Sequence, residues 1–390
     1  MERSMDDKTL ALMKQAFKQY YFKAGDKIIP PTRMSEREFG YIPFGGSMIR
    51  HLSFKTFGDL YALLVREAPH SVYYSAAYYH EPTLPMHDKG WKGGDLIFDI
   101  DADNLKLPCK KDHDLWECKN CGLKRIGLRP EKCPNCGEVS ISELNWACEK
   151  CLEAAKNEAL KLIEILMKDF GINKSEIKTY FSGNMGYHIT IESAEFEDLD
   201  QTARSEIADY VSGRGLIPES IGVFKRATYE DLLKNLPRVG EPGWRGRLAI
   251  SFKNWKVKGF DNDNDVIKKI ATLYGKIRYS KFKKRLEVEA LNMGAVIDTM
   301  VTTDVHRIFR MPDTLHGETG LLKKMCDNLL DFDPLNEAVV LSDELVEVFI
   351  DYSPKFRLKD QIYRTFKKEK VKLPLMAAVY LAGKGLARVI

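Results

Sequence analysis

The sequence predicts an α/β protein of the α+β kind, with mixed β-sheets flanked by helices, a cysteine-rich zinc-binding insertion and a smaller, mainly helical subdomain. Three observations predict this class. Short apolar runs typical of buried strands, such as the one that ends at Asp101, alternate with helical patterns such as that of 152–169. Seven of the eight cysteines lie between Cys109 and Cys151. Residues 199–285 are mostly helical in pattern, with a Gly/Pro-rich break at 237–246.

The composition is that of a soluble globular protein, with 390 residues, 44% hydrophobic and 30% charged. The N-terminus has no apolar signal core, and no stretch approaches the roughly 18 apolar residues of a membrane helix. We therefore expect a cytoplasmic protein with no membrane segment. The net charge of +4 neither supports nor excludes a nucleic-acid partner, which would have to bind local basic patches.

In chain order, residues 5–22 have the pattern of an amphipathic helix, and the aromatic, proline-punctuated segment that follows, through Gly46, predicts short strands and turns. The run from Gly94 to Asp101 reads as a buried strand that ends in two carboxylates, Asp99 and Asp101. Side chains alternate along a strand, so both point to one face, roughly 6 to 7 Å apart. Such a pair suits Mg²⁺ or Mn²⁺ and phosphoryl or nucleotidyl transfer. The alternative is a strand that runs into an acidic loop.

The cysteine block predicts two tetrahedral zinc sites, because three Cys-x-x-Cys pairs recur in a chain without a secretion signal. Its seven thiolates and His113 make eight ligands. A glycine follows both Cys121 and Cys136, as in a zinc knuckle. This favours one ribbon-like site of Cys118, Cys121, Cys133 and Cys136, and a second site of Cys109, His113, Cys148 and Cys151. An exchange of the 133/136 and 148/151 pairs is the alternative. Both sites would be structural, because four protein ligands leave no open position.

After the cysteine block, a helix is expected over 152–169, and strands over 177–181 and 189–191 with a loop between them. Residues 296–311 return to strand-like alternation. The charged C-terminal stretch from about Leu341 has helical character.

Two further segments carry residues suited to phosphate chemistry. The loop Ser182-Gly-Asn-Met-Gly-Tyr-His188 joins small residues to a hydroxyl and an imidazole, although any hairpin turn has a similar composition. Asp304 could complete a three-carboxylate metal site, with Arg310 and His316 facing a triphosphate. The alternative is a strand with a capped end. Basic residues between Lys276 and Arg285 predict either a phosphate-tracking face or an ordinary solvated helix.

These motifs, in this order, resemble the catalytic small subunit of the archaeal and eukaryotic DNA primase. The resemblance rests on Phe98–Asp101, on the Ser-Gly-x-x-Gly-x-His pattern of 182–188, on Asp304 with Arg310 and His316, on Arg37-Glu38-Phe39, and on the Cys-x-x-Cys with its helix at 148–169. It covers roughly residues 1–330.

The resemblance implies a primase core and a nucleotidyltransferase, a DNA primase with DNA-directed RNA polymerase activity. It would start short RNA primers, and DNA primers as a further option, on single-stranded DNA from nucleoside triphosphates. Two Mg²⁺ or Mn²⁺ ions would be held by Asp99, Asp101 and Asp304. The incoming nucleotide would be bound by Ser182, Gly183, Asn184, His188, Arg310, His316 and Arg37. The partners would be a primase large subunit, in a heterodimer, and the template and primer strands.

The expected organisation is a discontinuous catalytic core of 1–105, 147–198 and 290–390, a zinc-binding region of 106–151 with a ribbon inserted at 118–136, and a helical subdomain of 199–289. The sequence departs from the family in two ways. Many members have a basic residue where this chain has Asn184 and Met185, so one phosphate contact is absent or comes from elsewhere, such as Arg226 or the partner subunit. The ribbon is the second departure, inserted into the family's single zinc site.

Two other functions are compatible with parts of the sequence. A primase-polymerase of repair or mobile-element type would share the carboxylates, but the zinc-pinned helix and the lack of ligase or helicase segments argue against it. A zinc-containing nucleic-acid-binding module without activity would need one of the three carboxylates to be displaced.

Overall fold

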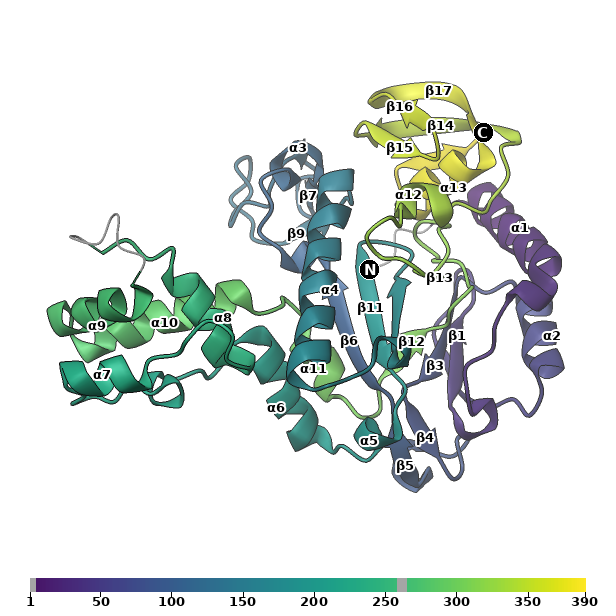
Figure 1. Cartoon of the computed structure of the whole chain (residues 1–390). Coiled ribbons are helices and arrows are strands. Elements are labelled where there is room, and N and C mark those ends of the chain that lie inside the picture. The colour runs from purple at the N-terminus through teal and green to yellow at the C-terminus, as the bar shows by residue number, and fades with distance from the viewer. Residues whose placement is uncertain (1–4, 258–264) are drawn as a thin grey trace.

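Two four-stranded sheets form the centre of the fold in the computed structural model, which describes residues 5–257 and 265–390. One sheet has the order β12-β3-β1-β2 and the other β13-β10-β11-β6 (Figure 1). The strands of the first are β12 (Ile308–Arg310), β3 (Ser71–Ser75), β1 (Phe39–Ile42) and β2 (Ile49–Leu52). Those of the second are β13 (Lys324–Met325), β10 (Ile177–Phe181), β11 (Gly186–Ile191) and β6 (Leu96–Asp101).

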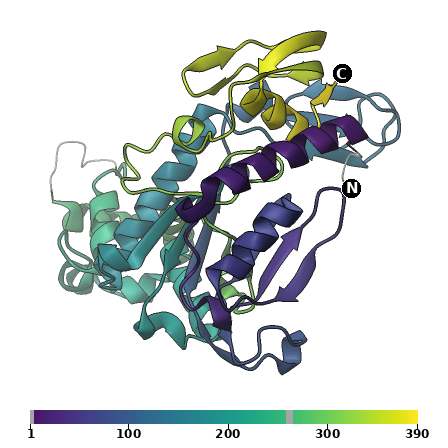
Figure 2. The ribbon, with the colours of Figure 1, turned by 90° about the vertical axis from the view of Figure 1, so that its right-hand side faces the viewer.

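Helices flank these sheets, which confirms the predicted α/β class. The helix expected over 152–169 is α4 (Glu149–Asp169), which packs on β6 and β11 through buried residues such as Leu162 and Ile165. The N-terminal helix α1 (Asp7–Ala24) and α2 (Phe57–Glu67) lie together beside the first sheet (Figure 2). Every strand pairing in the described residues is antiparallel, where mixed sheets were expected.

Smaller elements complete the core. A hairpin of β4 (Ala77–Tyr79) and β5 (Trp91–Gly94) leads into β6, and the short helix α5 (Ala194–Glu197) packs beside it. Single 3₁₀ turns lie at Gly25–Lys27, Met34–Glu36, Met86–Asp88, Ala102–Asn104, Lys174–Glu176 and Pro218–Ile221.

The segment 296–311 differs from its prediction. It forms helix α11 (Thr299–Thr303) and then the short strand β12, instead of one continuous strand. The Asp298 side chain accepts a hydrogen bond from the Met300 N–H at 2.9 Å and caps this helix, a local contact that competes with strand formation.

The C-terminal stretch also differs, because it is mainly β-structure instead of helical. It contains β14 (Leu345–Ser353), β15 (Phe356–Leu358), β16 (Gln361–Tyr363), β17 (Phe366–Pro374), α13 (Leu375–Gly383) and β18 (Ala387–Val389), after the short helix α12 (Pro334–Glu337). Lysines on exposed positions of β17 follow a strand period at the sheet edge, where charge blocks pairing with other chains. The charged residues of this stretch are therefore compatible with the exposed edge of a sheet as well as with a helix.

The helical region projects from the core as a separate lobe (Figure 1). It contains α7 (Tyr229–Asn235), α8 (Gly243–Phe252), α9 (Val266–Lys276) and α10 (Tyr279–Met293), which surround their own hydrophobic cluster between Ile221 and Ala290. In contrast, α6 (Gln201–Ser212) places Ala208 and Val211 in the main core. We therefore propose that the subdomain predicted over 199–289 begins after α6.

The zinc-binding region contains α3 (Lys110–His113) and a three-stranded sheet of β8 (Lys124–Ile126), β7 (Leu115–Cys118) and β9 (Ile141–Leu144). Across residues 5–257 and 265–390, no helix combines the length and the apolar character that a bilayer crossing requires.

Candidate active site and metal centres

The Asp pair lies where the second sheet exposes the end of its strand β6. The neighbouring strand β11 pairs antiparallel with β6, so that His188 lies opposite Asp99 and Gly186 opposite Asp101. The β10–β11 hairpin thus carries the predicted 182–188 loop onto the two carboxylates. His188 lies on the strand itself, since β11 begins at Gly186, three residues before the predicted start.

Gly186 is required by the close approach of the hairpin to β6. A Cβ added to residue 186 would lie 1.8 Å from the carbonyl oxygen of Ile100 and 2.6 Å from Oδ1 of Asp101. No side chain fits there without displacing backbone. The glycine of the loop pattern therefore has a steric function beside the carboxylates.

A third carboxylate, Asp298, lies beside the pair. Its backbone N–H donates to the carbonyl oxygen of Asp99 at 2.9 Å, and α11 packs on β6. Burial is the main cause that raises the pKa of Asp99 to about 6, and the negative charge of Asp298 adds to it. The pKa of Asp101 rises to about 8 through burial and then the charge of Asp99. The charge of Asp298 therefore acts on both carboxyl groups of the pair.

Asp304, the residue predicted to be the third carboxylate, is not brought to this site. Asp298 precedes α11 and Asp304 follows it, so the helix separates them by roughly 9 Å. Asp304 is exposed and accepts a hydrogen bond from the His306 N–H at 3.0 Å. The prediction failed because it treated 296–311 as a strand. The sequence feature that could have identified Asp298 is its position directly after the apolar run Ala295-Val296-Ile297. Asp99 likewise follows an apolar run directly.

The turn of the hairpin is held by Ser182. Its Oγ accepts hydrogen bonds from the N–H groups of Asn184 at 3.3 Å and Gly186 at 3.2 Å. Gly183 has a φ of 87°, and a Cβ on it would lie 3.0 Å from the Cβ of His316. The turn is thus packed directly against His316, another predicted site residue.

Both predicted histidines are neutral. Burial holds the pKa of His188 and of His316 well below the usual value, and nearby cations, among them Arg310, add to the effect. Nε2 of His188 lies 3.4 Å from Oδ1 of Asp99. Nδ1 of His316 accepts a hydrogen bond from the Glu318 N–H at 3.2 Å, which leaves Nε2 as the N–H donor.

Cations also lie near the carboxylates, because Lys323 and Arg310 are among the charges that act on Asp99 and Asp101. Arg310, on β12, donates to the Ser71 hydroxyl at 2.9 Å and lies over the ring of Tyr73. Lys323 is fully buried, and its ammonium donates to the carbonyl oxygen of Arg310 at 2.7 Å. Burial lowers the pKa of Lys323 to about 7, although Asp99 favours its charged form. The site therefore combines clustered carboxylates with desolvated cations.

One pocket contains most of the predicted residues. It is lined by Tyr73, Asp99, Asp101, Ser182, Asn184, His188, Val301, Arg307, Ile308, Phe309, Arg310 and His316. Tyr73 and Arg307 were not among the predicted site residues. Tyr73 reaches the pocket because β3 pairs with β12, and Arg307 directly precedes β12.

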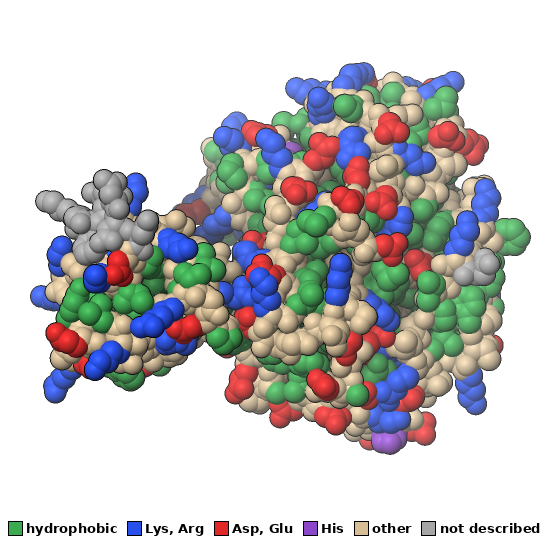
Figure 3. Space-filling view, in the orientation of Figure 1, with side chains coloured by type: hydrophobic (Ala, Val, Ile, Leu, Met, Phe, Trp, Pro, Cys, Tyr) green, Lys and Arg blue, Asp and Glu red, His purple; other side chains and the backbone are tan. Residues whose placement is uncertain are grey.

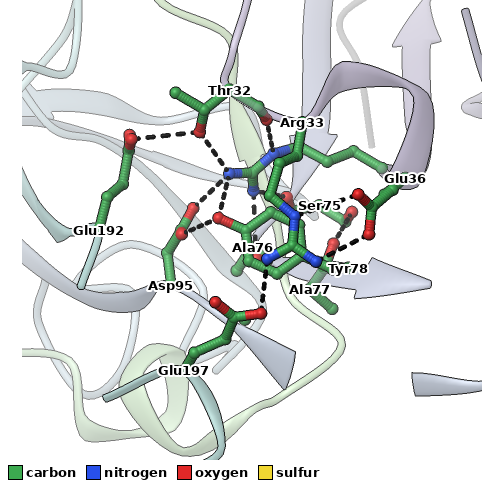
Figure 4. Close-up of polar contacts among 12 residues, drawn as sticks. Thr32, Arg33, Glu36, Ser75, Ala76, Ala77, Tyr78, Asp95, Glu192 and Glu197 are labelled. Carbon is green, nitrogen blue, oxygen red and sulfur yellow. Dashed lines mark hydrogen bonds and ion pairs between the residues drawn. The ribbon is translucent and has the colours of Figure 1, made fainter. Parts of the chain in front are cut away.

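Arg37 was predicted to contact the nucleotide, and the structure contradicts this. Its guanidinium is fully buried and forms an ion pair with Asp95 at 2.7 Å. It also donates to the Ser75 carbonyl and to the hydroxyl of Tyr78 (Figure 4). All of these partners lie outside the pocket, so Arg37 ties β1 to the β4–β5 hairpin.

Replacement of Arg37 by methionine is therefore expected to reduce stability instead of nucleotide affinity. It leaves the buried Asp95 charge without its ion-pair partner and with only the Tyr78 hydroxyl as a side-chain donor, which costs about 3 to 5 kcal/mol. Urea denaturation measures this loss. The double variant Arg37→Met/Asp95→Asn should recover part of it, and a variant as stable as the wild type would contradict the structural assignment.

The two predicted zinc sets are each brought together. The ligand atoms of Cys109, His113, Cys148 and Cys151 lie within 4.8 Å of one another, as do those of Cys118, Cys121, Cys133 and Cys136. The alternative exchange of pairs is not the arrangement found. In the first set, Cys148 is the N-cap residue of α4 and Cys151 is in its first turn, so this cluster lies at the foot of the helix. Nδ1 of His113 contacts Asp114 at 2.8 Å, which orients the ring.

The basic run 276–285 does not form a stacking surface for bases. Phe282 is fully buried in the core of the helical lobe, and Tyr279 donates to Glu219. The lysines remain at or near the surface, where Lys and Arg side chains are interspersed with acidic ones over the lobe (Figure 3). The solvated helix face is therefore the better interpretation of this run.

The raised carboxyl pKa values predict a pH dependence of the metal-free protein. An aspartate in the unfolded chain has a pKa of about 3.9, whereas the pKa of Asp101 in the folded protein is about 8. Between these values the folded state binds more protons, so stability falls as the pH rises. From these values we expect a loss of about 3 to 4 kcal/mol of unfolding free energy between about pH 5 and pH 8.

The control for this prediction is Asp101→Asn. Denaturation of protein that retains its zinc but is prepared without Mg²⁺ or Mn²⁺ should show a smaller pH slope for the variant and a higher stability than the wild type at about pH 8. Addition of Mn²⁺ should restore the wild type but not the variant. Equal slopes for both proteins would contradict the clustered-carboxylate account.

Comparison with known proteins repeatedly finds DNA primase small subunits. The family model described as DNA primase small subunit matches residues 132–327. The DNA primase small subunit of Nitrosopumilus maritimus is 38% identical over 99% of this chain and 100% of the relative. That of Cenarchaeum symbiosum is 38% identical over 98% and 99%, respectively, and that of Methanothrix thermoacetophila is 31% identical over 99% and 100%.

A solved structure, the polymerase domain from Mycobacterium tuberculosis Ligase D in complex with DNA, aligns with 85% of this chain and 89% of its own. The sequences are 10% identical and the TM-score is 0.38, a similarity too weak to bear on function.

Proposed function

Because the chain belongs to the DNA primase small subunit family, we propose that it is the catalytic subunit of a primase, a nucleotidyltransferase that makes short primers on single-stranded DNA. The observation that carries this proposal is the pocket lined by Asp99, Asp101, Arg310 and two neutral histidines, with Asp298 near enough for its charge to raise the pKa of both aspartates. Carboxylates that hold dications next to donors for phosphate are what phosphoryl transfer needs.

The carboxylates fit a divalent cation by their own chemistry. Oδ1 of Asp99 is buried without a hydrogen-bond partner, and the raised pKa values reflect negative charges that repel one another. A Mg²⁺ or Mn²⁺ ion between Asp99, Asp101 and Asp298 would satisfy the oxygen and relieve the repulsion. Such ions, when bound, activate the attacking 3′-hydroxyl and neutralise the pyrophosphate leaving group.

The residues around the carboxylates would bind and orient the triphosphate. The 182–185 turn presents backbone near the pocket without side-chain bulk at Gly183. His316, neutral and with its Nε2–H free to donate, suits a phosphate oxygen, and Arg310 adds a fixed positive charge. His188 lies with Nε2 3.4 Å from Oδ1 of Asp99, where it would be next to a bound cation. Catalysis here is positioning and electrostatic stabilisation.

The cysteine clusters would each hold one structural zinc ion, so that two zinc ions per chain are expected. The proposed partners are a primase large subunit, a single-stranded DNA template with its primer, and nucleoside triphosphates. Synthesis of RNA primers is the finer activity that we propose, and the family membership supports it.

A direct assay tests the proposal. The full-length chain is incubated with single-stranded template, Mn²⁺ and nucleoside triphosphates, with and without a primer and with the large subunit of the same source. We expect dinucleotides without a primer and extension products with one. No product under any of these conditions would contradict the proposed activity.

A further inference from the structure

Lys384 is a buried cation close to the candidate active site. It follows the C-terminal helix α13, and only 6% of it is exposed. Its ammonium lies 5.5 Å from the ring centre of Trp146 and 5.3 Å from that of Tyr380. Aromatic faces offset only a part of the cost of desolvation. Burial lowers the pKa of Lys384 to about 8, so the side chain still carries its charge at neutral pH.

No carboxylate is paired with this charge in the described residues. Glu318 is the acidic residue that favours the protonated form of Lys384, but its side chain is exposed and forms no ion pair with the ammonium. The hydrogen bond of the ammonium goes to Oδ1 of Asn184, at 3.4 Å. A buried ammonium that lacks a carboxylate is costly, and it is retained most readily where a negatively charged ligand arrives.

The contact with Asn184 fixes the orientation of its carboxamide. An ammonium group has donors only, so the amide must present its oxygen to Lys384. The NH₂ group of Asn184 then points away from Lys384. Asn184 lines the pocket with Asp99 and His316, and its backbone is held by Ser182. An amide N–H donor at this place suits a phosphate oxygen.

Lys384 also contributes charge behind the turn. The segment 182–188 contains no lysine or arginine of its own. Lys384 is among the cations that favour the neutral form of His316, so its positive charge acts on a residue that lines the pocket. Arg226, a cation considered from sequence, is exposed in the region of the helical lobe and does not line the pocket.

We propose that Lys384 is a positioning residue for the nucleoside triphosphate: it holds the carboxamide of Asn184 so that the NH₂ group faces the pocket, and it adds positive charge behind the 182–188 turn. This inference rests on the proposed function. It assigns the C-terminal helix, about 200 residues away in sequence, a role in nucleotide affinity.

The test compares Lys384→Met, Asn184→Ala and the double variant in primer extension with Mn²⁺. Methionine retains the length of the side chain without the charge. We expect Lys384→Met to raise KM for the nucleoside triphosphate about tenfold and to change kcat by less than about twofold, because binding is lost equally in the ground and transition states. Lys384→Arg should recover most of the affinity.

The double variant separates a role through Asn184 from a general one. If Lys384 acts by orienting this amide, the double variant should have a KM close to that of whichever single variant has the higher KM. The reason is that effects within one contact are not additive. Multiplied effects would overturn the positioning role. An unchanged KM in Lys384→Met would overturn the proposal altogether.

Lys269→Met is the matched control. Lys269 is also buried, and its ammonium donates to the carbonyl oxygen of Lys253 at 2.9 Å, within the helical lobe. Its KM should equal that of the wild type, and an increase matching that of Lys384→Met would indicate a general structural effect and overturn the proposal. Lys384→Gln provides a second neutral variant if the methionine variant does not fold.

A calorimetric measurement of ATP binding in the presence of Mn²⁺ tests the role of Lys384 independently of primer synthesis. A wild-type chain that makes no primer contradicts the proposed function. The same chain still tests Lys384, because its ATP affinity should fall about tenfold in Lys384→Met. Equal affinities would overturn the inference even if the enzyme is active.

Discussion

Replacement of Asp298 by asparagine is expected to reduce primer synthesis on the order of a thousandfold, as are Asp99→Asn and Asp101→Asn. Each substitution removes a charge from a cluster whose carboxylates influence one another's pKa. Loss of a metal-binding carboxylate costs several kcal/mol of transition-state stabilisation. Extension of a labelled primer under single-turnover conditions measures the change, with thermal unfolding as a check on folding.

Asp304→Asn is the control for this prediction. Asp304 is six residues from Asp298, exposed, and at the other end of α11. We expect its activity to remain within about threefold of the wild type, because an exposed carboxylate that lies outside the pocket contributes little. If Asp304→Asn is inactive and Asp298→Asn is active, the assignment of the third carboxylate from the structure is wrong.

Replacement of Cys151 by serine is expected to have the largest effect on stability. Cys151 is fully buried at the foot of α4, where this helix enters the main core. A structural zinc site contributes about 10 kcal/mol or more, comparable with the whole stability of a domain. We expect the variant to bind one zinc ion instead of two and to lose its cooperative thermal unfolding transition.

Cys133→Ser in the ribbon is the comparison variant. Cys133 belongs to a small separate cluster with Trp116, Cys118 and Ile141. It should also lose one zinc ion, but the main unfolding transition and primer extension should persist. A Cys151→Ser protein that unfolds like the wild type, or a wild-type protein with fewer than two zinc ions, would contradict the assignment of the clusters.

The parts of the fold that follow from local spacing were predicted from the sequence. The α4 helix was found because its apolar residues repeat at helical spacing, and the zinc sets because Cys-x-x-Cys pairs with a following glycine have few other uses. The C-terminal sheet was missed. The lysines of β17 are compatible with a helical face or a sheet edge, and pairing with β14 decides between them.

The candidate site was predicted where its residues lie on neighbouring strands. Asp99 and His188 pair across β6 and β11, and the sequence of each strand pointed to them independently. Asp298 was missed because a short capped helix follows it, which the pattern of 296–311 did not reveal. The burial of Arg37 depends on Asp95, 58 residues away, and no local pattern carries that information.

The location of Mn²⁺ in crystals of the full chain tests the central claim most directly. Crystals are soaked with Mn²⁺ and a non-hydrolysable nucleoside triphosphate, and an anomalous difference map is recorded at the manganese absorption edge. The account predicts peaks among the carboxylates of Asp99, Asp101 and Asp298, with the triphosphate extending toward Arg310 and His316. Peaks beside Asp304, or no peak at the Asp99–Asp101 pair, would contradict it.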